Sequence, residues 1–236
     1  MKLNKVIFFI FLTKLSLEQK ALDIDLAIDC SPKSANVLFL IDASPKVNSN
    51  TFTDLLFRII PTIIQTFNEH LSKFFLSILR YTDRVIEIIP LQKIDNPNLI
   101  TSKLISIEKE TKTSNAIRAL DKSAQIFQAT KNNVNLCIWF TDGLFDDRSF
   151  PSLVKKADNL KNSCQMLLFN FGPNGDVIKL RRLASANNFV YKTQDIDAFL
   201  NKSIEIFNFG CINDSIKKLS FILFNYKSLD KNYKNH

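Results

Sequence analysis

The sequence predicts an α/β protein in which a mostly parallel sheet carries helices on both faces. From residue 36 onward, apolar runs of strand length alternate with segments whose apolar residues recur every three or four positions. Strands joined by helices form right-handed crossovers, and such crossovers produce a parallel sheet that is covered on both sides. The composition, with 46% hydrophobic and 23% charged residues, fits one globular domain with appendages and excludes a disordered chain.

The first predicted elements are a buried strand and a long helix. Residues 37–41 are all apolar and lead into Asp42, which is typical of a strand buried on both faces. Residues 52–67 then place their apolar side chains on one helical face. We expect Asn50 to cap this helix, and Pro61 to kink it or split it in two because proline cannot donate the helical hydrogen bond.

The remaining pattern continues the alternation, with one exception near the start. Residues 74–81 and 84–91 predict two strands joined by a turn at Thr82-Asp83, a hairpin that would form an antiparallel edge. The elements expected after this hairpin are helices over 98–107 and 114–130, a strand over 136–141, a helix over 152–162, a strand over 165–171, a helix over 177–186, a strand over 189–192 and a helix over 196–207.

Residues 1–20 have the features of a signal peptide. Two lysines in the first five residues precede an apolar run over 6–12. The run is too short to span a bilayer, which takes about 20 apolar residues, so we predict no transmembrane segment. A secreted, extracellular protein is therefore expected. If residues 1–17 are not a signal, the same chain would be intracellular.

Residues 212–236 are predicted to form a basic tail outside the domain. The net charge of the chain is +8, and residues 216–236 hold five lysines and one acidic residue. A basic tail can bind nucleic acid, but basic and aromatic residues do not interleave along one face, and we expect no nucleic-acid partner. Asn201 and Asn213 each begin an Asn-x-Ser triplet and are candidate glycosylation sites.

The four cysteines are compatible with secretion. Cys30 and Cys211 bracket the patterned region, and we expect a disulfide between them because it would join the two ends of one domain. Cys137 lies in an apolar strand and is expected to be a buried thiol. Cys164 follows a predicted helix and could also be free.

Two of the predicted strands end in an acidic residue, Asp42 or Asp142. Ligands of open α/β sheets bind at the carboxyl ends of the strands, near the change in strand order. A buried carboxylate is costly unless a cation or hydrogen-bond donors meet it, so two such acids suggest a shared hard cation with hydroxyls completing its shell. The pattern alone is equally compatible with two capped, solvated aspartates.

Four motifs, in order, resemble those of von Willebrand factor type A domains. Asp42-Ala-Ser44-Pro-Lys46 is similar to the Asp-x-Ser-x-Ser loop that opens the family's metal-ion-dependent adhesion site. Arg80-Tyr81-Thr82-Asp83 resembles the family's Tyr-Ser-Asp turn after the second strand. Thr111 and Thr141-Asp142-Gly143 resemble its later threonine and its Thr-Asp-Gly triplet. The resemblance covers roughly residues 30–211, which we take as the domain.

The resemblance implies a doubly wound, six-stranded, Rossmann-like sheet with a metal site at its carboxyl edge. Ser44 and Thr111 would be direct ligands, while Asp42 and Asp142 would act largely through coordinated water. In many family members a carboxylate of the partner completes the shell of a magnesium ion, so Mg²⁺ is the expected cofactor. The implied function is adhesion or extracellular-matrix binding to a protein ligand.

The sequence departs from the family's pattern at Lys46, which stands where a second ligand serine is expected. Lysine has no acceptor and cannot bind a cation while it is charged. An ammonium at about 4 Å from a dication would cost on the order of 8 kcal/mol at an effective dielectric of about 20. Either Lys46 turns away and water replaces the missing ligand, or its ammonium replaces the ion between Asp42 and Asp142. Both alternatives predict an impaired or metal-free site.

A partner-binding face is predicted around this site, and it includes Lys46, Thr113, Asp146 and Asp147. Thr113 offers a hydroxyl, although it is equally suited, as is Ser114, to cap the following helix. Asp146 and Asp147 lie in a loop at the same edge of the sheet. They would shape the electrostatic field of the face or simply form a polar turn.

Enzymatic functions find no support in the motifs. The sequence contains no Gly-x-Gly-x-x-Gly, Gly-Lys-Ser/Thr, Gly-x-Ser-x-Gly or His-Glu-x-x-His. Its two histidines, His70 and His236, have no serine or cysteine partner nearby in sequence. We expect a non-enzymatic binding protein. The alternative is an intracellular scaffold or assembly subunit of the same fold that binds partners without metal.

Overall fold

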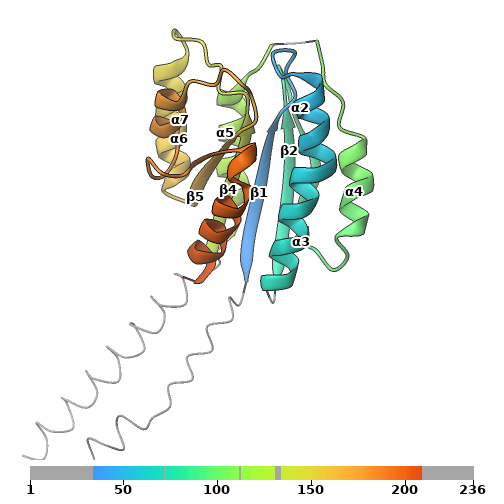
Figure 1. The fold of residues 1–236 in the computed structure, drawn as a ribbon. Helices are drawn as coiled ribbons and strands as arrows, with labels where there is room; N and C mark the ends of the chain where they lie inside the picture. Colours follow the sequence, from blue (N-terminus) through green and yellow to red (C-terminus); the bar gives the residue numbers. More distant parts are fainter. Residues whose placement is uncertain (1–33, 72, 112, 131–133, 209–236) are drawn as a thin grey trace, which may run out of the picture.

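The computed structural model contains a six-stranded sheet with the strand order β3-β2-β1-β4-β5-β6 (Figure 1). It describes residues 34–71, 73–111, 113–130 and 134–208. Every strand pair is parallel except β2 with β3. The predicted doubly wound, mostly parallel sheet is therefore confirmed.

Strand β1 (Ala35–Asp42) lies at the centre of the sheet, between β2 (Phe74–Tyr81) and β4 (Val134–Thr141). All eight residues of β1 are buried, which explains its unbroken apolar run. The chain moves outward from β1 to β2 and β3 and then returns to the other side of β1 as β4. This change in strand order between β1 and β4 opens the crevice where such sheets bind ligands.

The two edges of the sheet differ. The predicted hairpin forms one edge, where β3 (Val85–Lys93) runs antiparallel to β2. The other edge is built from β5 (Gln165–Asn170) and the short strand β6 (Val190–Lys192), which are both parallel to β4.

The first long helix is continuous from residue 49 to residue 70. It consists of α2 (Ser49–Asp54), the π-helical segment η1 (Leu55–Ile59) and α3 (Ile60–His70). Pro61 was predicted to kink this helix or split it in two, and the helix is not split there. Instead, the N–H of Ile60 bonds the carbonyl of Leu55, five residues back, and this wider π-helical register ends directly before the proline that cannot donate.

The N-caps of two helices differ from the sequence prediction. Asn48, rather than Asn50, caps α2, because its side chain accepts from the N–H groups of Asn50 and Thr51 at 2.9 and 3.3 Å. Asn115, rather than Thr113 or Ser114, caps the helix α5 (Ala116–Gln128). In both helices several adjacent polar residues are competent caps, and the tertiary position of the loop selects one of them.

The other helices cover both faces of the sheet, as predicted. They are α4 (Asn98–Ile105), α6 (Phe150–Lys161), α7 (Val177–Leu183) and a helix over 196–208. In Figure 1 the helix over 196–208 and α2–α3 lie in front of the sheet, and α5 lies behind it. The two front helices touch through the rings of Phe67 and Phe207, whose centroids are 5.1 Å apart.

Phenylalanine side chains form a continuous part of the core. Edge-to-face and tilted ring contacts at 5.4, 5.7 and 5.5 Å connect Phe39, Phe140, Phe169 and Phe199 in series. These contacts join β1, β4 and β5 to the helix over 196–208. Aromatic pairs thus link the two sides of an otherwise largely aliphatic core.

Only some of the cysteines and candidate glycosylation sites lie within the described residues. Cys137 and Cys164 are buried free thiols, and Cys164 donates to the carbonyl of Leu160 at 3.5 Å. Cys30, Cys211 and Asn213 lie outside the described residues, whereas Asn201 is exposed on the helix over 196–208. Within the described part of the chain, no helix is long and apolar enough to cross a membrane.

Candidate functional site

The two acidic strand ends come together at the carboxyl edge of the sheet. Asp42 ends β1, and Asp142 directly follows β4, the neighbour of β1 across the switch point. Asp42 is only 2% exposed and Asp142 only 4% exposed. The alternative of two solvated aspartates is therefore excluded. Both carboxylates lie inside the protein.

Asp42 has donors for both of its carboxylate oxygens. The backbone N–H of Ser44 donates to Oδ1 at 3.0 Å, and the hydroxyl of Tyr81 donates to Oδ2 at 3.1 Å. The indole N–H of Trp139 in turn donates to the Tyr81 oxygen at 2.8 Å. This buried network, which joins β1, β2 and β4, holds the Asp42 carboxylate in one orientation.

Asp142 and Ser44 each present a buried oxygen without a partner. Oδ1 of Asp142 accepts from the N–H of Leu144 at 3.0 Å, but its Oδ2 has no hydrogen-bond partner, and neither does the hydroxyl of Ser44. Among the described residues, these two oxygens are the fully buried side-chain oxygen or nitrogen atoms that lack a hydrogen-bond partner. Buried polar atoms are rarely left unpaired unless a ligand or ion completes them.

Burial governs the acidity of both carboxyl groups. Burial, followed by the neighbouring Asp142, raises the pKa of Asp42 to about 6, although the N–H of Ser44 opposes the shift. Burial also raises the pKa of Asp142, against the N–H of Leu144 and the positive charge of Lys46. Burial thus disfavours the charged form of both carboxyl groups, and a bound cation would stabilise that charged form.

Three of the protein's four glycines surround the backbone of Asp142. A Cβ on Gly172 would lie 2.7 Å from the Asp142 carbonyl oxygen and 2.9 Å from its Cα, and one on Gly175 would lie 2.7 Å from the same oxygen. Gly143 has a φ of 74°, in the left-handed region that favours glycine. The loops after β4 and β5 therefore pack backbone against backbone, and this contact fixes the position of Asp142.

Lys46 is exposed at the tip of the loop after β1. Within the described residues it forms no ion pair with Asp42 or Asp142, although its charge is near enough to lower the pKa of Asp142. Of the two alternatives from the sequence, this position favours the lysine that turns away over the ammonium that replaces the ion.

Thr111 and Thr113 lie in the loop between α4 and α5, and both are exposed. The loop is anchored beside β1 because the N–H of Glu110 donates to the carbonyl of Ala43 at 3.1 Å. Thr111 thus directly follows Glu110, the residue that contacts the loop carrying Ser44. In the described part of the chain, Thr111 makes no hydrogen bond to either aspartate.

An anchor that the sequence did not reveal holds this loop. Arg80 is 8% exposed, and its guanidinium bonds the Glu110 carboxylate at 2.5 Å and the carbonyl of Glu108 at 3.0 Å. Thr82 also donates to Glu110 at 3.0 Å. Arg80 and Thr82 stood in the Arg-Tyr-Thr-Asp motif, and an arginine inside an otherwise apolar strand was the available signal for a buried ion pair.

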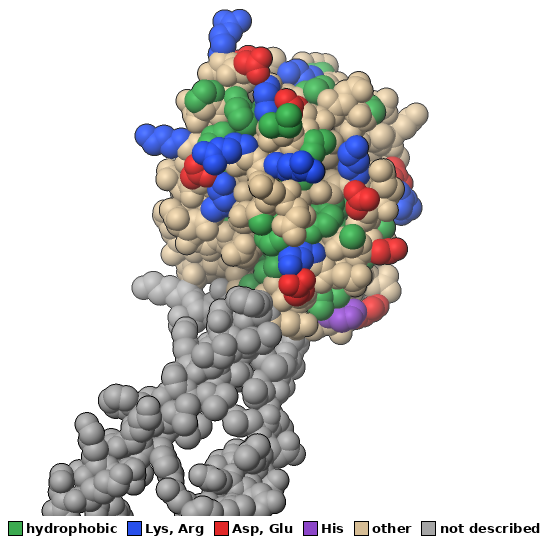
Figure 2. Space-filling model, turned by 60° about the vertical axis from the view of Figure 1, so that its left-hand side comes forward, with side chains coloured by type: hydrophobic (Ala, Val, Ile, Leu, Met, Phe, Trp, Pro, Cys, Tyr) green, Lys and Arg blue, Asp and Glu red, His purple; other side chains and the backbone are tan. Residues whose placement is uncertain are grey.

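Asp146 and Asp147 lie in the loop between β4 and α6, at the same edge as Asp142, and both are exposed. Asp147 bonds Lys179 of α7 at 2.5 Å, and this ion pair lowers the pKa of Asp147. On the side of the molecule that carries α6 and α7, basic side chains are scattered, with acidic ones between them (Figure 2).

Residues 36–209 match the von Willebrand factor type A domain, so the chain belongs to this family. This match confirms the resemblance seen in the sequence motifs. The matched range includes the carboxyl edge just described, with Asp42, Ser44 and Asp142. No curated protein sequence matches the chain.

Solved structures of low sequence identity share the fold. The pilus adhesin SpaC from Lactobacillus rhamnosus GG, in its open conformation, superposes with a TM-score of 0.60 at 11% identity, covering 75% of this chain and 30% of the adhesin. Proximal thread matrix protein 1 from the mussel byssus, with a zinc-occupied site, gives 0.58 at 21% identity, covering 81% and 50%. Manganese-loaded TRAP protein from Plasmodium vivax gives 0.58 at 15% identity, covering 75% and 72%.

The chain matches only part of several of these structures. It covers 30% of the SpaC chain and 47% of another crystal structure of the mussel protein. At these identities the likeness establishes the fold. Activities and partners of the longer proteins are not transferred by it.

Proposed function

We propose that the protein is a non-enzymatic, extracellular protein-binding domain whose partner docks at the carboxyl edge of the sheet. One observation carries this proposal. The buried oxygens Ser44 Oγ and Asp142 Oδ2 lack partners at the edge where the fold binds ligands. The face around them includes Lys46, Thr113, Asp146 and Asp147.

The donor set fits a divalent cation such as Mg²⁺. Ser44 and Asp142 would supply the two unpaired oxygens, Thr111 would complete the protein ligands from the neighbouring loop, and Asp42 would hold Ser44 in place through its backbone N–H. The described residues contain no group of three or more His, Cys, Asp or Glu that could hold a metal, so hydroxyls are needed beside the two carboxylates. A bound cation would supply a Lewis-acidic position for a carboxylate of the partner.

Lys46 makes this site a degenerate one. The position that a second serine would occupy holds an exposed lysine, so one direct ligand is missing and a positive charge lies near Asp142. Both effects weaken cation binding, the first by loss of a ligand and the second by repulsion. We therefore propose weak binding of the metal, with water in place of the missing serine.

Several features support an extracellular location. The structural neighbours include a pilus adhesin and a byssus matrix protein. The predicted signal peptide over 1–20, the predicted Cys30–Cys211 disulfide and the candidate glycosylation sites Asn201 and Asn213 would all fit secretion. Mass spectrometry of the mature protein tests these features together, because it reads the N-terminus, the disulfide and the glycans.

Metal binding is tested by calorimetric titration of Mg²⁺ and Mn²⁺. The unmodified protein should bind weakly, Asp142→Asn should weaken binding at least about tenfold, and Asp147→Asn should leave it unchanged. Asp147 is the matched control because it lies in the same loop but is exposed and paired with Lys179. If neither the unmodified protein nor Lys46→Ser binds a cation, the metal-free intracellular scaffold becomes the better account.

A further inference from the structure

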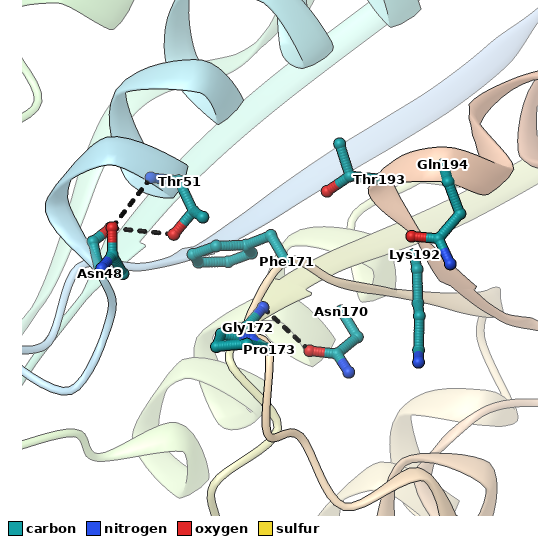
Figure 3. A pocket seen from close by; sticks show the side chains of 9 residues that line it. All are labelled: Asn48, Thr51, Asn170, Phe171, Gly172, Pro173, Lys192, Thr193 and Gln194. Atoms are coloured by element: carbon teal, nitrogen blue, oxygen red, sulfur yellow. Dashed lines mark hydrogen bonds between the residues drawn. The ribbon is translucent and has the colours of Figure 1, made fainter.

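We propose that a pocket beside the metal site binds a second carboxylate of the protein partner, carried by an aspartate or glutamate side chain. The pocket has a volume of about 340 Å³ and lies at the carboxyl ends of β5 and β6, opposite the start of α2 (Figure 3). The inference rests on the proposed function, because it names a second anchor for the same partner. It adds a site that the metal does not occupy.

The sheet and one loop connect the pocket to the proposed metal site. Asn170 of β5 is the register neighbour of Thr141 on one side and of Lys192 on the other. The pocket wall at Gly172 packs directly on the backbone of Asp142, where an added Cβ would lie within 3.0 Å of three Asp142 atoms. A partner segment that reaches the metal site is therefore one strand away from the pocket.

Asn170 supplies a donor that nothing in the described protein uses. The residue is only 2% exposed, and its Oδ1 accepts from the N–H of Gly172 at 3.0 Å. That bond fixes the orientation of the side-chain amide, and Nδ2 points away from Gly172 (Figure 3). Nδ2 has no hydrogen-bond partner among the described residues. Nδ2 is not among the fully buried atoms without a partner, so it is accessible and can donate to a bound acceptor.

Lys192 supplies the charge. Its side chain is exposed at the end of β6 and forms no ion pair within the described part of the chain. In Figure 3 its ammonium lies on the same side of the pocket as the amide nitrogen of Asn170. Across the pocket, Asn48 and Thr51 are hydrogen-bonded to each other at the start of α2. The N–H of Thr51 donates to Asn48 Oδ1 at 3.3 Å, and Thr51 Oγ1 donates to the Asn48 carbonyl at 3.0 Å.

The lining as a whole selects a carboxylate on a short apolar stem. None of the nine lining residues is acidic, and Lys192 is the one charged residue among them. An amide N–H and an ammonium are the donors that a carboxylate binds through charge-assisted hydrogen bonds. Phe171 and Pro173 provide apolar wall for the methylene groups of an aspartate or glutamate side chain.

The test is an NMR titration of the full-length, ¹⁵N-labelled protein in the presence of a chelator, with propionate as the probe. Propionate should shift the side-chain amide signals of Asn170 and the backbone signal of Lys192, and neutral propionamide should bind at least about tenfold more weakly. Lys192→Gln should weaken propionate binding roughly tenfold. Lys155→Gln, which removes an exposed lysine on α6, should change nothing.

Three results would overturn the proposal: no shift at Asn170 at the highest propionate concentration, equal binding of propionamide, or the same affinity in Lys192→Gln and Lys155→Gln. The chelator keeps the metal site out of the measurement. Failure of metal binding in the calorimetric experiment would therefore leave this result standing. Failure of the pocket would likewise leave the metal site untouched.

Discussion

Asp42 and Asp142 end neighbouring strands of the same sheet, but their carboxylates are held in different ways. Asp42 has a donor on each oxygen, from Ser44 and Tyr81. Asp142 has a donor on one oxygen only, and the other faces the interior without a partner. The comparison assigns Asp42 to positioning the first loop, and it leaves Asp142 and the Ser44 hydroxyl as the groups with capacity for a ligand.

The surroundings of the two residues differ as well. Asp142 is enclosed by the backbone of the glycine-containing loops after β4 and β5. The loop after Asp42 instead turns outward, so that Pro45 and Lys46 are exposed. One half of the site is thus fixed by close packing, whereas the other half carries the residue that departs from the family's pattern.

The largest effect is expected from Gly172→Ala. The new Cβ would clash with backbone atoms of Asp142, which cannot rotate away, so we expect a loss of about 3 kcal/mol or more in the free energy of unfolding. Denaturant unfolding measures this loss, with Ser152→Ala on the exposed surface of α6 as the control. A loss no larger than that of the control would mean that packing does not fix Asp142.

The next effect is a pH dependence carried by Asp42. Its pKa in the folded protein, about 6, lies above the value of about 3.9 for an unfolded aspartate, so the folded state holds the proton more tightly. The stability of the chelator-treated protein should therefore fall as the pH rises from about 4 to 6 and level off above that window, by on the order of 3 kcal/mol.

The Asp42→Asn variant isolates this contribution. The amide does not titrate, so unfolding measured from pH 4 to 7 should show a flatter profile than the unmodified protein. Asp147→Asn is the control, because Asp147 is exposed and Lys179 lowers its pKa. Identical slopes in the unmodified protein and Asp42→Asn would show that Asp42 is not the group responsible.

A smaller loss is expected from Tyr81→Phe. The change removes the donor to Asp42 and leaves the buried indole N–H of Trp139 without an acceptor, which should cost about 1–3 kcal/mol. Tyr191→Phe is the matched control, because the Tyr191 hydroxyl has no hydrogen bond to the described residues. Thermal unfolding compares the two variants. Equal losses of stability in the two variants would show that the hydrogen bonds of Tyr81 do not stabilise the fold.

The fold and part of the site were predictable from the sequence. Apolar periodicity identified the strands and helices, and the acidic ends of two apolar strands identified Asp42 and Asp142, because both signals are local in sequence. The network from Trp139 through Tyr81 to Asp42 was not predictable, since it joins side chains 58 and 39 residues apart.

The close approach of the loops after β4 and β5 was hidden for a related reason. The sequence did not show that Gly143, Gly172 and Gly175 gather around one residue. The choice of Asn48 over Asn50 as the cap likewise depends on where the chain leaves β1. These features depend on which segments meet in space.

The central claim is that a cation site at Asp42, Ser44 and Asp142 has been weakened by Lys46. Calorimetric titration of Mg²⁺ into the unmodified protein and Lys46→Ser tests it most directly. We expect the serine variant to bind at least about tenfold more tightly, because it regains a ligand and loses a repelling charge, with Lys46→Gln between the two. Equal affinities, or tight binding by the unmodified protein that Lys46→Ser does not improve, would contradict the account.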